Sequence, residues 1–189
     1  MKTTENLLIG LILLCGIAVK LFGVLDMPGA SNFYFATVIG MTILPLFYAV
    51  QNKFSIYTIV LILLAIESLG EIFYVQHWQG QGIVTTVGLS GTVLFPIILL
   101  FTSLRQWTLE KNRYLLFIAI ILLLQIALVM TWAERLDNYR SITFYVLFAV
   151  IATLKLNKVQ VRNELSNILT YYLIGATLFL IRDIFRLVS

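Results

Sequence analysis

The sequence has few of the residues that usually carry charge or chemistry. Only 12% of its 189 residues are charged, and it holds one cysteine, Cys15, and one histidine, His77. A single cysteine excludes a disulfide framework and a thiolate metal site, and one histidine among scattered carboxylates lacks metal-ligand spacing. No serine stands in a nucleophile elbow, and no glycine-rich loop has a phosphate-binding pattern. The sequence therefore indicates no metal or other cofactor, and it gives little support for an enzyme.

Apolar residues make up 60% of the chain, whereas a soluble domain is closer to half apolar and about a quarter charged. A membrane-spanning helix needs roughly 20 mostly apolar residues, so about seven fit this length if the loops are short. We therefore predict an all-α, polytopic integral membrane protein in which residues 1–189 form one transmembrane domain, with the lipid bilayer as its main partner. The net charge of +4 comes mostly from short loops and does not indicate nucleic-acid binding.

The predicted helices are separated by short polar or glycine-containing segments. They cover residues 6–25, 33–50, 56–76, 83–104, 114–132, 141–154 and 167–188. We expect a turn over 134–140 and a polar loop over 155–166, because charged and amide side chains dominate both segments. Pro45 and Pro96 fall inside predicted helices, where neighbouring helices can satisfy the carbonyl groups that a proline frees.

Lysine and arginine are distributed unequally between the two sides of this arrangement. The loops on the side opposite to the N-terminus hold two such residues, Arg135 and Arg140. The N-terminal side and the loops on that side hold eight: Lys2, Lys53, Arg105, Lys111, Arg113, Lys155, Lys158 and Arg162. Because lysine and arginine favour cytoplasmic loops, we predict a bacterial inner (cytoplasmic) membrane protein with a cytoplasmic N-terminus and, with seven helices, an outer C-terminus.

The first four predicted helices form a tandem repeat of two helical hairpins. A shift of 51 positions superposes residues 6–51 on residues 56–104 without a gap, and two of the three prolines fall in register. The matched pairs are Gly29 with Gly80, Gly40 with Gly91, Pro45 with Pro96, Phe22 with Phe73 and Val24 with Val75. We predict that the two hairpins share one topology, as in a parallel repeat. The C-terminal helices, over residues 114–188, show no comparable glycine or proline pattern.

Polar residues inside the predicted spans, or at their ends, form the candidate site. They are Lys20, Asp26, Glu67, Glu71, His77, Gln125, Arg182 and Asp183. The repeat aligns Lys20 with Glu71, so opposite charges occupy equivalent depths. A charge at the helix centre costs on the order of 2.5–3.5 kcal/mol by insertion scales, so several charges that face lipid separately would be hard to sustain. We expect the charged groups to converge on a polar cavity or an ion-pair network that opens to the outer side.

Two interpretations of this cluster stay open, one structural and one functional. Lys20, Glu71, Arg182 and Asp183 either form ion pairs that fix helix packing or belong to a binding or proton-relay site. Glu67 is nearer the centre of its helix, and burial disfavours the charged form of a carboxyl group. We therefore predict that Glu67 takes up a proton near neutral pH and has a functional role.

Other polar and aromatic residues receive simpler interpretations. His77 is predicted to be a turn residue at the membrane interface. The tyrosines Tyr34, Tyr48, Tyr171 and Tyr172 are interpreted as core or interface aromatics. These readings leave the intramembrane carboxylates as the residues most open to a functional role.

The first hairpin also resembles a known type of membrane protein. Its turn reads Lys20-Leu21-Phe22, then Asp26-Met27-Pro28-Gly29-Ala30-Ser31, and it is echoed by His77-Trp78-Gln79-Gly80. This pattern resembles a helical hairpin of Bacteroidota membrane proteins, among them the membrane motor subunit of the gliding and type 9 secretion machinery. Here Asp26 replaces that family's histidine, and Gln79 and Glu71 replace its proline and lysine in the second copy. The resemblance implies a hairpin and a Bacteroidota-like origin. It does not imply the motor function, because that subunit has two transmembrane helices.

Three classes of function are consistent with the sequence. The leading class is a small membrane protein with an outward-facing polar cavity that handles a proton, an ion or a small solute. The alternative is a structural or accessory subunit of a cell-envelope complex, with a membrane-protein partner or a second copy of the chain. The third is an enzyme that acts on lipid through Glu71, Asp26 and His77. The substrate and the partner cannot be named from the sequence.

Overall fold

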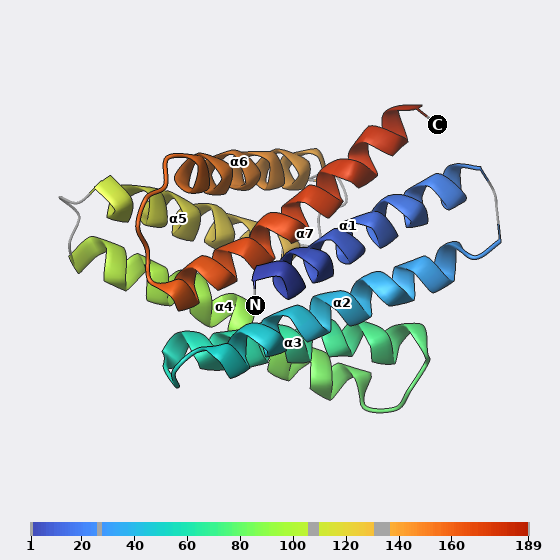
Figure 1. Cartoon of the computed structure of the whole chain (residues 1–189), viewed down its shortest axis with the longest axis horizontal. Coiled ribbons are helices and arrows are strands. Elements are labelled where there is room, and N and C mark those ends of the chain that lie inside the picture. Colours follow the sequence, from blue (N-terminus) through green and yellow to red (C-terminus); the bar gives the residue numbers. More distant parts are fainter. Residues whose placement is uncertain (1, 26–27, 106–109, 131–136, 189) are drawn as a thin grey trace.

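A computed structural model describes residues 2–25, 28–105, 110–130 and 137–188, and these form seven helices and no strand. The helices run alternately in opposite directions (Figure 1). Their bounds are α1 Lys2–Val24, α2 Ala30–Gln51, α3 Ile56–Val75, α4 Gln81–Arg105, α5 Glu110–Met130, α6 Asp137–Leu156 and α7 Asn163–Val188. The all-α prediction and the number of helices are therefore confirmed for the described part of the chain.

The last three helices are longer than the sequence pattern predicted. α5 begins at residue 110 rather than 114, α6 at 137 rather than 141, and α7 at 163 rather than 167. The predicted turn at 134–140 and the predicted loop at 155–166 are thus wrong where they overlap α6 and α7. The cause is that polar residues suit the ends of helices as well as loops. α7 begins with Asn163 and Glu164, and an acidic side chain in the first turn complements the helix dipole.

The two N-terminal hairpins have matching turns. Gly29 and Gly80 precede α2 and α4 with φ angles of 106° and 88°, a region that favours glycine. The backbone N–H of Asn32 donates to the Gly29 carbonyl and that of Ile83 donates to the Gly80 carbonyl, both at 3.0 Å. The two hydrogen bonds therefore occupy equivalent positions, 51 residues apart, in the two hairpins.

The matching extends into the helix contacts. A Cβ atom at Gly40 would overlap the side chain of Ile12, and one at Gly91 would overlap Leu63. Ile12 and Leu63 are again 51 positions apart. Pro45 and Pro96, the other matched pair, are both buried inside their helices. One close glycine contact between the helices of each hairpin therefore falls at equivalent positions.

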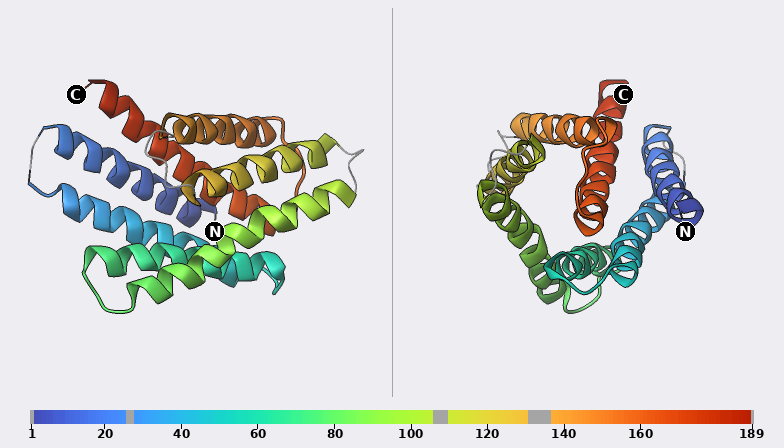
Figure 2. Two further views of the ribbon diagram at one scale, coloured as in Figure 1. Left: turned by 180° about the vertical axis from the view of Figure 1, so that it is seen from behind. Right: turned by 60° about the vertical axis from the view of Figure 1, so that its left-hand side comes forward.

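The chain curves so that its last helix packs against its first three. α7 contacts α1, α2, α3 and α6, and the right-hand view of Figure 2 shows it inside the curve that the other helices make. The core between them is aliphatic and aromatic, with Leu61, Phe95, Ile118, Leu147 and Ile168 fully buried. This packing closes the bundle and brings α7 next to the middle of α3.

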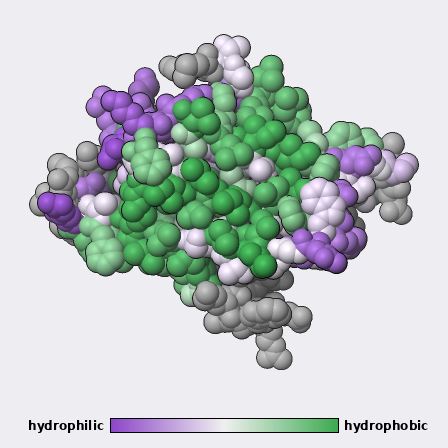
Figure 3. All heavy atoms as spheres, turned by 90° about the horizontal axis from the view of Figure 1, so that it is seen from below, coloured by the Kyte–Doolittle hydropathy of each residue, from purple (hydrophilic) through white to green (hydrophobic). Residues whose placement is uncertain are grey.

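The outer surface of the bundle is strongly apolar. Apolar side chains cover its middle, and polar residues gather toward the ends (Figure 3). Leu14 is 64% exposed and Phe101 69%, which water would disfavour and lipid would accept. Five helices, α1–α4 and α7, are long and apolar enough to cross a membrane, whereas the described apolar parts of α5 and α6 are shorter. The chain is therefore a helical membrane protein with five candidate spans.

Polar contacts tie the helices together at one end. The Tyr48 hydroxyl on α2 donates to Glu5 on α1 at 2.7 Å. Lys155, in the last turn of α6, donates to the Ser166 hydroxyl at 2.9 Å and to the Thr170 hydroxyl at 2.7 Å on α7. Tyr48 is 1% exposed, so its bond to Glu5 is shielded from water. These bonds add polar links between helix ends that also pack through apolar side chains.

Candidate functional site

Glu67 lies on the face of α3 that meets α4. Its carboxyl oxygen Oε2 accepts a hydrogen bond from the Thr92 hydroxyl on α4. This bond holds the carboxyl group in one orientation, near the middle of α3.

Glycines explain why these two helices lie close enough for that bond. A Cβ atom at Gly88 would overlap the backbone of Glu67 itself. Gly70 on α3 lies in the same way against the backbone of Thr85 on α4. Small residues at helix interfaces let backbones approach closely in membranes. Since Thr92 stands one turn after Gly88, the close approach also places its hydroxyl over Glu67.

Glu67 and Thr92 line a cavity of about 360 Å³ between α3, α4, α5, α6 and α7. Six of its eleven lining residues are apolar, and five are polar: Glu67, Thr92, Gln125, Tyr171 and Tyr172. Ligand sites typically combine such apolar walls with a few placed polar groups, in volumes of about 300–1,000 Å³. The cavity thus has the size and the lining of a small-molecule site.

Two of the polar groups in this cavity make no hydrogen bond of standard geometry, although the Tyr172 hydroxyl lies beside Thr92. Within the described residues, three buried side-chain polar atoms lack such a bond: Ser103 Oγ, Gln125 Nε2 and Tyr172 Oη. Gln125 and Tyr172 both line the cavity. Leaving a buried polar group unpaired costs about 1–3 kcal/mol. Such groups in one cavity, beside a carboxyl group, are typical of a place where a ligand completes the hydrogen bonding.

Tyr171 makes a second polar contact between helices beside the cavity. Its hydroxyl is 2.8 Å from the hydroxyl of Ser68, the residue that follows Glu67 on α3. Ser68 is buried, so this bond fixes α7 against α3 beside the cavity. Tyr171 and Tyr172 both line the cavity together with Glu67.

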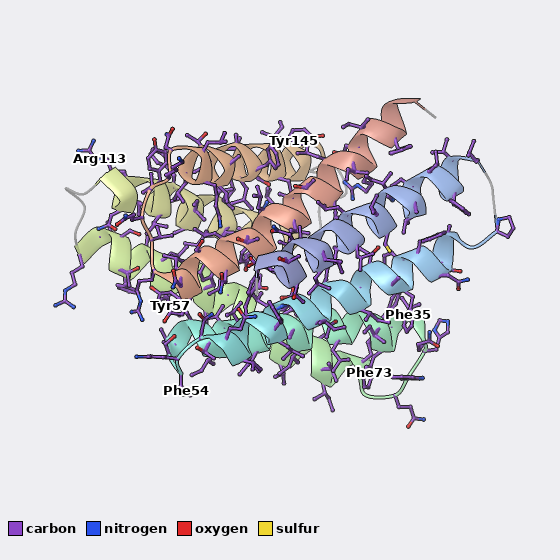
Figure 4. All side chains as sticks on the ribbon, in the orientation of Figure 1. Phe35, Phe54, Tyr57, Phe73, Arg113 and Tyr145 are labelled. Atoms are coloured by element: carbon purple, nitrogen blue, oxygen red, sulfur yellow. The ribbon has the colours of Figure 1, made fainter. Side chains whose placement is uncertain are left out.

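The remaining candidate residues lie outside this cavity. Glu71 is exposed and accepts a long hydrogen bond of 3.5 Å from Tyr34. Arg182 pairs with its neighbour Asp183 at 3.1 Å, and Asp183 also accepts a bond of 2.6 Å from Tyr145 on α6; Tyr145 is marked in Figure 4. These contacts form two further groups, one between α3 and α2 and one between α7 and α6.

Three candidates lie near the ends of the first and third helices. Lys20 is half-buried on α1, and it does not line the cavity. His77 is exposed in the turn after α3, with a φ of 53°. Asp26 lies outside the described residues. Of the eight candidates, the structure thus brings Glu67 and Gln125 together in one cavity.

Three lining residues were missed or read otherwise from the sequence. Thr92 was not singled out, although it follows Gly88 by one helical turn and a glycine marks a close helix contact. Tyr171 and Tyr172 were interpreted as core aromatics, yet both line the cavity. Their pairing with α3 could not be predicted, because the fold of α7 against α3 joins segments about 100 residues apart.

No protein-family model, no curated protein and no solved structure matches this chain. The resemblance of the first hairpin to the gliding-motor membrane subunit therefore stays a prediction. A functional assignment rests on the geometry of the Glu67 cavity alone. That geometry can bind one small, mostly apolar molecule through a carboxyl group at one wall and hydrogen-bond donors at the others.

Proposed function

We propose that this membrane protein binds a small, mostly apolar solute in the Glu67 cavity and exchanges a proton or a cationic group at that carboxyl. The observation that carries the proposal is the meeting of Glu67 with the unpaired Gln125 amide and Tyr172 hydroxyl in one cavity of about 360 Å³. Ionisable residues inside membrane helices are costly and usually mark solute or proton pathways. The protein is therefore assigned to the class of solute- or proton-handling membrane proteins.

Each polar group in the cavity has a distinct role under this proposal. Glu67 accepts a proton, or a donor group of the solute, and Thr92 holds the carboxyl in position. Gln125 and Tyr172 donate to an acceptor group on the same solute. The aliphatic walls, such as Leu122 and Ile126, bind its apolar part. A solute with one donor and one acceptor group and a small apolar body satisfies all of these contacts.

Labelling with dicyclohexylcarbodiimide tests the site directly, because this apolar reagent enters membranes and reacts with protonated carboxyl groups. We expect the detergent-purified protein to be modified at Glu67 at mildly acidic pH, and peptide mass spectrometry locates the adduct. The Glu67→Gln variant should lack that adduct, whereas Glu71→Gln, the matched control one turn away, should keep it. Labelling of Glu71 alone, with Glu67 unmodified at every pH, would contradict the proposal.

Proteoliposomes test the activity itself. Vesicles that hold the protein and an internal pH-sensitive dye should report proton entry when an external acid pulse is applied. We expect Glu67→Gln to abolish this flux and Glu71→Gln to retain it. If the flux requires an added solute, small hydrophobic amines are the first probes, because an amine fits the Glu67 carboxyl. Equal flux through wild type and Glu67→Gln, with and without amines, would refute the assignment.

A structural or accessory subunit is the second candidate function. The observation in its favour is the ion pair of Arg182 and Asp183, because Tyr145 links it to α6 and Arg182 lies 3.7 Å from the centroid of the Phe179 ring. Such a group can fix helix packing without handling a solute. Under this alternative, Arg182→Met should lower thermal stability and break co-purification with an envelope partner. A stable variant that purifies with the same proteins would argue against it.

The placement in the membrane follows the same proposal. We infer that all seven helices span a bacterial inner membrane, with the N-terminus in the cytoplasm. Support comes from the charges: six described lysines and arginines lie at the end where α2, α4 and α6 finish, namely Lys53, Arg105, Arg113, Lys155, Lys158 and Arg162. Cysteines introduced at Lys53 and Lys158 in a Cys15→Ser background should react with an impermeant maleimide only in inverted vesicles. Labelling of either in intact cells would contradict this topology.

We also propose that the two N-terminal hairpins arose by duplication. The turns at Gly29 and Gly80 and the contacts at Gly40 and Gly91 support it, since each pair is separated by 51 positions. In this scheme Glu67 corresponds to Gly16 of the first copy. The first hairpin therefore supplies a scaffold, and the second copy carries the site.

A further inference from the structure

A second cavity lies at the basic end of the bundle, away from Glu67. Its volume is about 290 Å³, and it is formed where α3 begins, α4 ends, and α5 and α7 begin. Two arginines, Arg105 and Arg162, line it together with Tyr57, Thr102 and Asn112, and none of the lining residues that the structure describes is acidic. No residue lines both this cavity and the Glu67 cavity. It is therefore a separate site with a positive charge.

The side chains at this cavity are arranged so that both guanidinium groups can reach an anion. Arg162 lies with its guanidinium carbon 5.6 Å from the centroid of the buried Tyr57 ring, which orients it over the cavity. Its contact with Glu164 measures 3.3 Å, and the Arg162 side chain is 65% exposed. The Glu164 side chain is 14% exposed. Because the Arg162 guanidinium of this pair is largely in solvent, the pair contributes roughly 0–1 kcal/mol and leaves Arg162 able to bind another anion. Arg105 is the last residue of α4 and also lines the cavity.

The surroundings favour phosphate as that anion. Arginine binds phosphate oxygens through paired hydrogen bonds in a fixed fork geometry. Basic pockets between transmembrane helices, at the level of the headgroups, bind anionic lipid headgroups. Tyr57, the residue marked at this end in Figure 4, lies in the first turn of α3, and Arg113 lies at the same end of the bundle. The cavity thus stands at the depth where a phospholipid places its phosphate.

We propose that the Arg105–Arg162 cavity binds a phosphate anion, carried by an anionic lipid headgroup or free in solution. The inference does not depend on the function of the Glu67 cavity. The two arginines and Tyr57 all line the cavity, and each of these side chains carries hydrogen-bond donors. An occupant would link α4 to α7, whose ends meet here, and would thereby stabilise the bundle.

Lipid titration of the detergent-purified protein tests this site. The binding of short-chain phosphatidylglycerol and of short-chain phosphatidylcholine is compared by native mass spectrometry. The thermal midpoint of unfolding is compared with each lipid added. Because each arginine near a headgroup contributes roughly fivefold, Arg105→Gln with Arg162→Gln should weaken phosphatidylglycerol binding roughly thirty-fold. The matched control is Lys53→Gln with Lys158→Gln, two exposed cations at the same end that do not line the cavity. This control should bind like the wild type.

A second arm separates the two sources of phosphate. Inorganic phosphate is compared with chloride at equal ionic strength in lipid-free detergent. A rise in the thermal midpoint of the wild type alone, lost in the arginine variant, identifies free phosphate as an occupant. Preference for phosphatidylglycerol without a response to inorganic phosphate identifies a lipid headgroup. Both results support the proposal.

Three results would overturn it: unchanged phosphatidylglycerol binding in the arginine variant, an equal loss in the lysine control, or equal binding of both lipids with no response to phosphate. If the double variant does not purify as a single species, Arg105→Gln alone replaces it, with an expected loss of roughly fivefold. Failure of this test leaves the Glu67 assignment untouched, because the carbodiimide and flux measurements use other residues.

Discussion

Gly88→Ala is the sharpest test of how the Glu67 site is held together. The new Cβ atom would overlap backbone atoms of Glu67, which cannot rotate away as a flexible side chain could. Non-bonded carbon atoms pack at about 3.5–4.0 Å, so α3 and α4 must separate by about 1 Å or more. Thr92 lies one turn further along α4, and the same shift stretches its bond to the Glu67 carboxyl.

The expected loss of stability has two parts. Forcing extra volume into a packed helix contact costs about 1–3 kcal/mol. Losing a hydrogen bond to a charged group costs about 1.5–3 kcal/mol. We therefore expect Gly88→Ala to lower the free energy of unfolding by about 2.5–6 kcal/mol. Thr92→Val, which removes the bond but leaves the helices in contact, should lose only the second part.

Thermal unfolding of the detergent-purified protein, followed by circular dichroism, measures these effects. Gly175→Ala is the matched control, because a Cβ atom in the middle of α7 meets nothing within 4 Å; it should be neutral or stabilising by up to about 1 kcal/mol. The double variant Gly88→Ala with Thr92→Val should be hardly worse than Gly88→Ala alone. If Gly88→Ala is as stable as Gly175→Ala, or if Thr92→Val keeps its full effect in the Gly88→Ala background, the proposed glycine contact is wrong.

Three further changes probe the rest of the bundle by the same melting assay. Ser68→Ala and Tyr171→Phe each remove one bond of 2.8 Å and should each lower stability by about 1 kcal/mol, with the double variant no worse than the larger single loss. Tyr48→Phe removes a buried donor to Glu5 and should lower the free energy of unfolding by about 1.5–3 kcal/mol. Tyr34→Phe, at an exposed contact of 3.5 Å, should change stability little. Equal effects of the two substitutions would contradict the burial argument. Gln125→Leu removes an unpaired buried amide and should raise stability by about 1–3 kcal/mol while it abolishes flux in proteoliposomes. A destabilised but active Gln125→Leu would mean that the amide has a structural partner.

Much of the fold could be predicted because apolar runs of about 20 residues have few alternatives in a membrane. The hairpin turns could also be placed, since Gly29 and Gly80 need positive φ angles and this requirement is visible in the chain. The starts of α5, α6 and α7 were missed because the rule that polar residues form loops does not distinguish a loop from the polar first turn of a helix. Single-residue boundaries therefore depend on capping and packing, which a hydropathy pattern does not contain.

The candidate site was only partly predictable for a different reason. Glu67 and Gln125 stand out in the sequence because polar residues near the centre of a span are rare. Their meeting in one cavity depends on the path of α5 and α7 around the bundle, and no local pattern encodes that path. Arg182 and Asp183 were expected to join the same cluster because they lie at a similar depth along their helix. The depth of a residue does not determine the direction in which its side chain points. In the structure the two residues pair with each other, and Asp183 also contacts α6.

The packing also argues for function over simple structure at Glu67. Glycines let α4 pack closely against α3, and α7 packs on α1, α2, α3 and α6. The Glu67 cavity that is left between these helices is also lined by side chains of α5 and α7. A chain selected for stability alone could fill this space with leucine, as it does at Leu61 and Leu99 nearby. Here the walls instead carry a carboxyl group, an unpaired amide and an unpaired hydroxyl. Polar groups that lower stability persist where a bound molecule completes their hydrogen bonds. The ion pair of Arg182 and Asp183 is satisfied within the protein, so it needs no such ligand, and the Glu67 cavity is the place where solute binding should be sought.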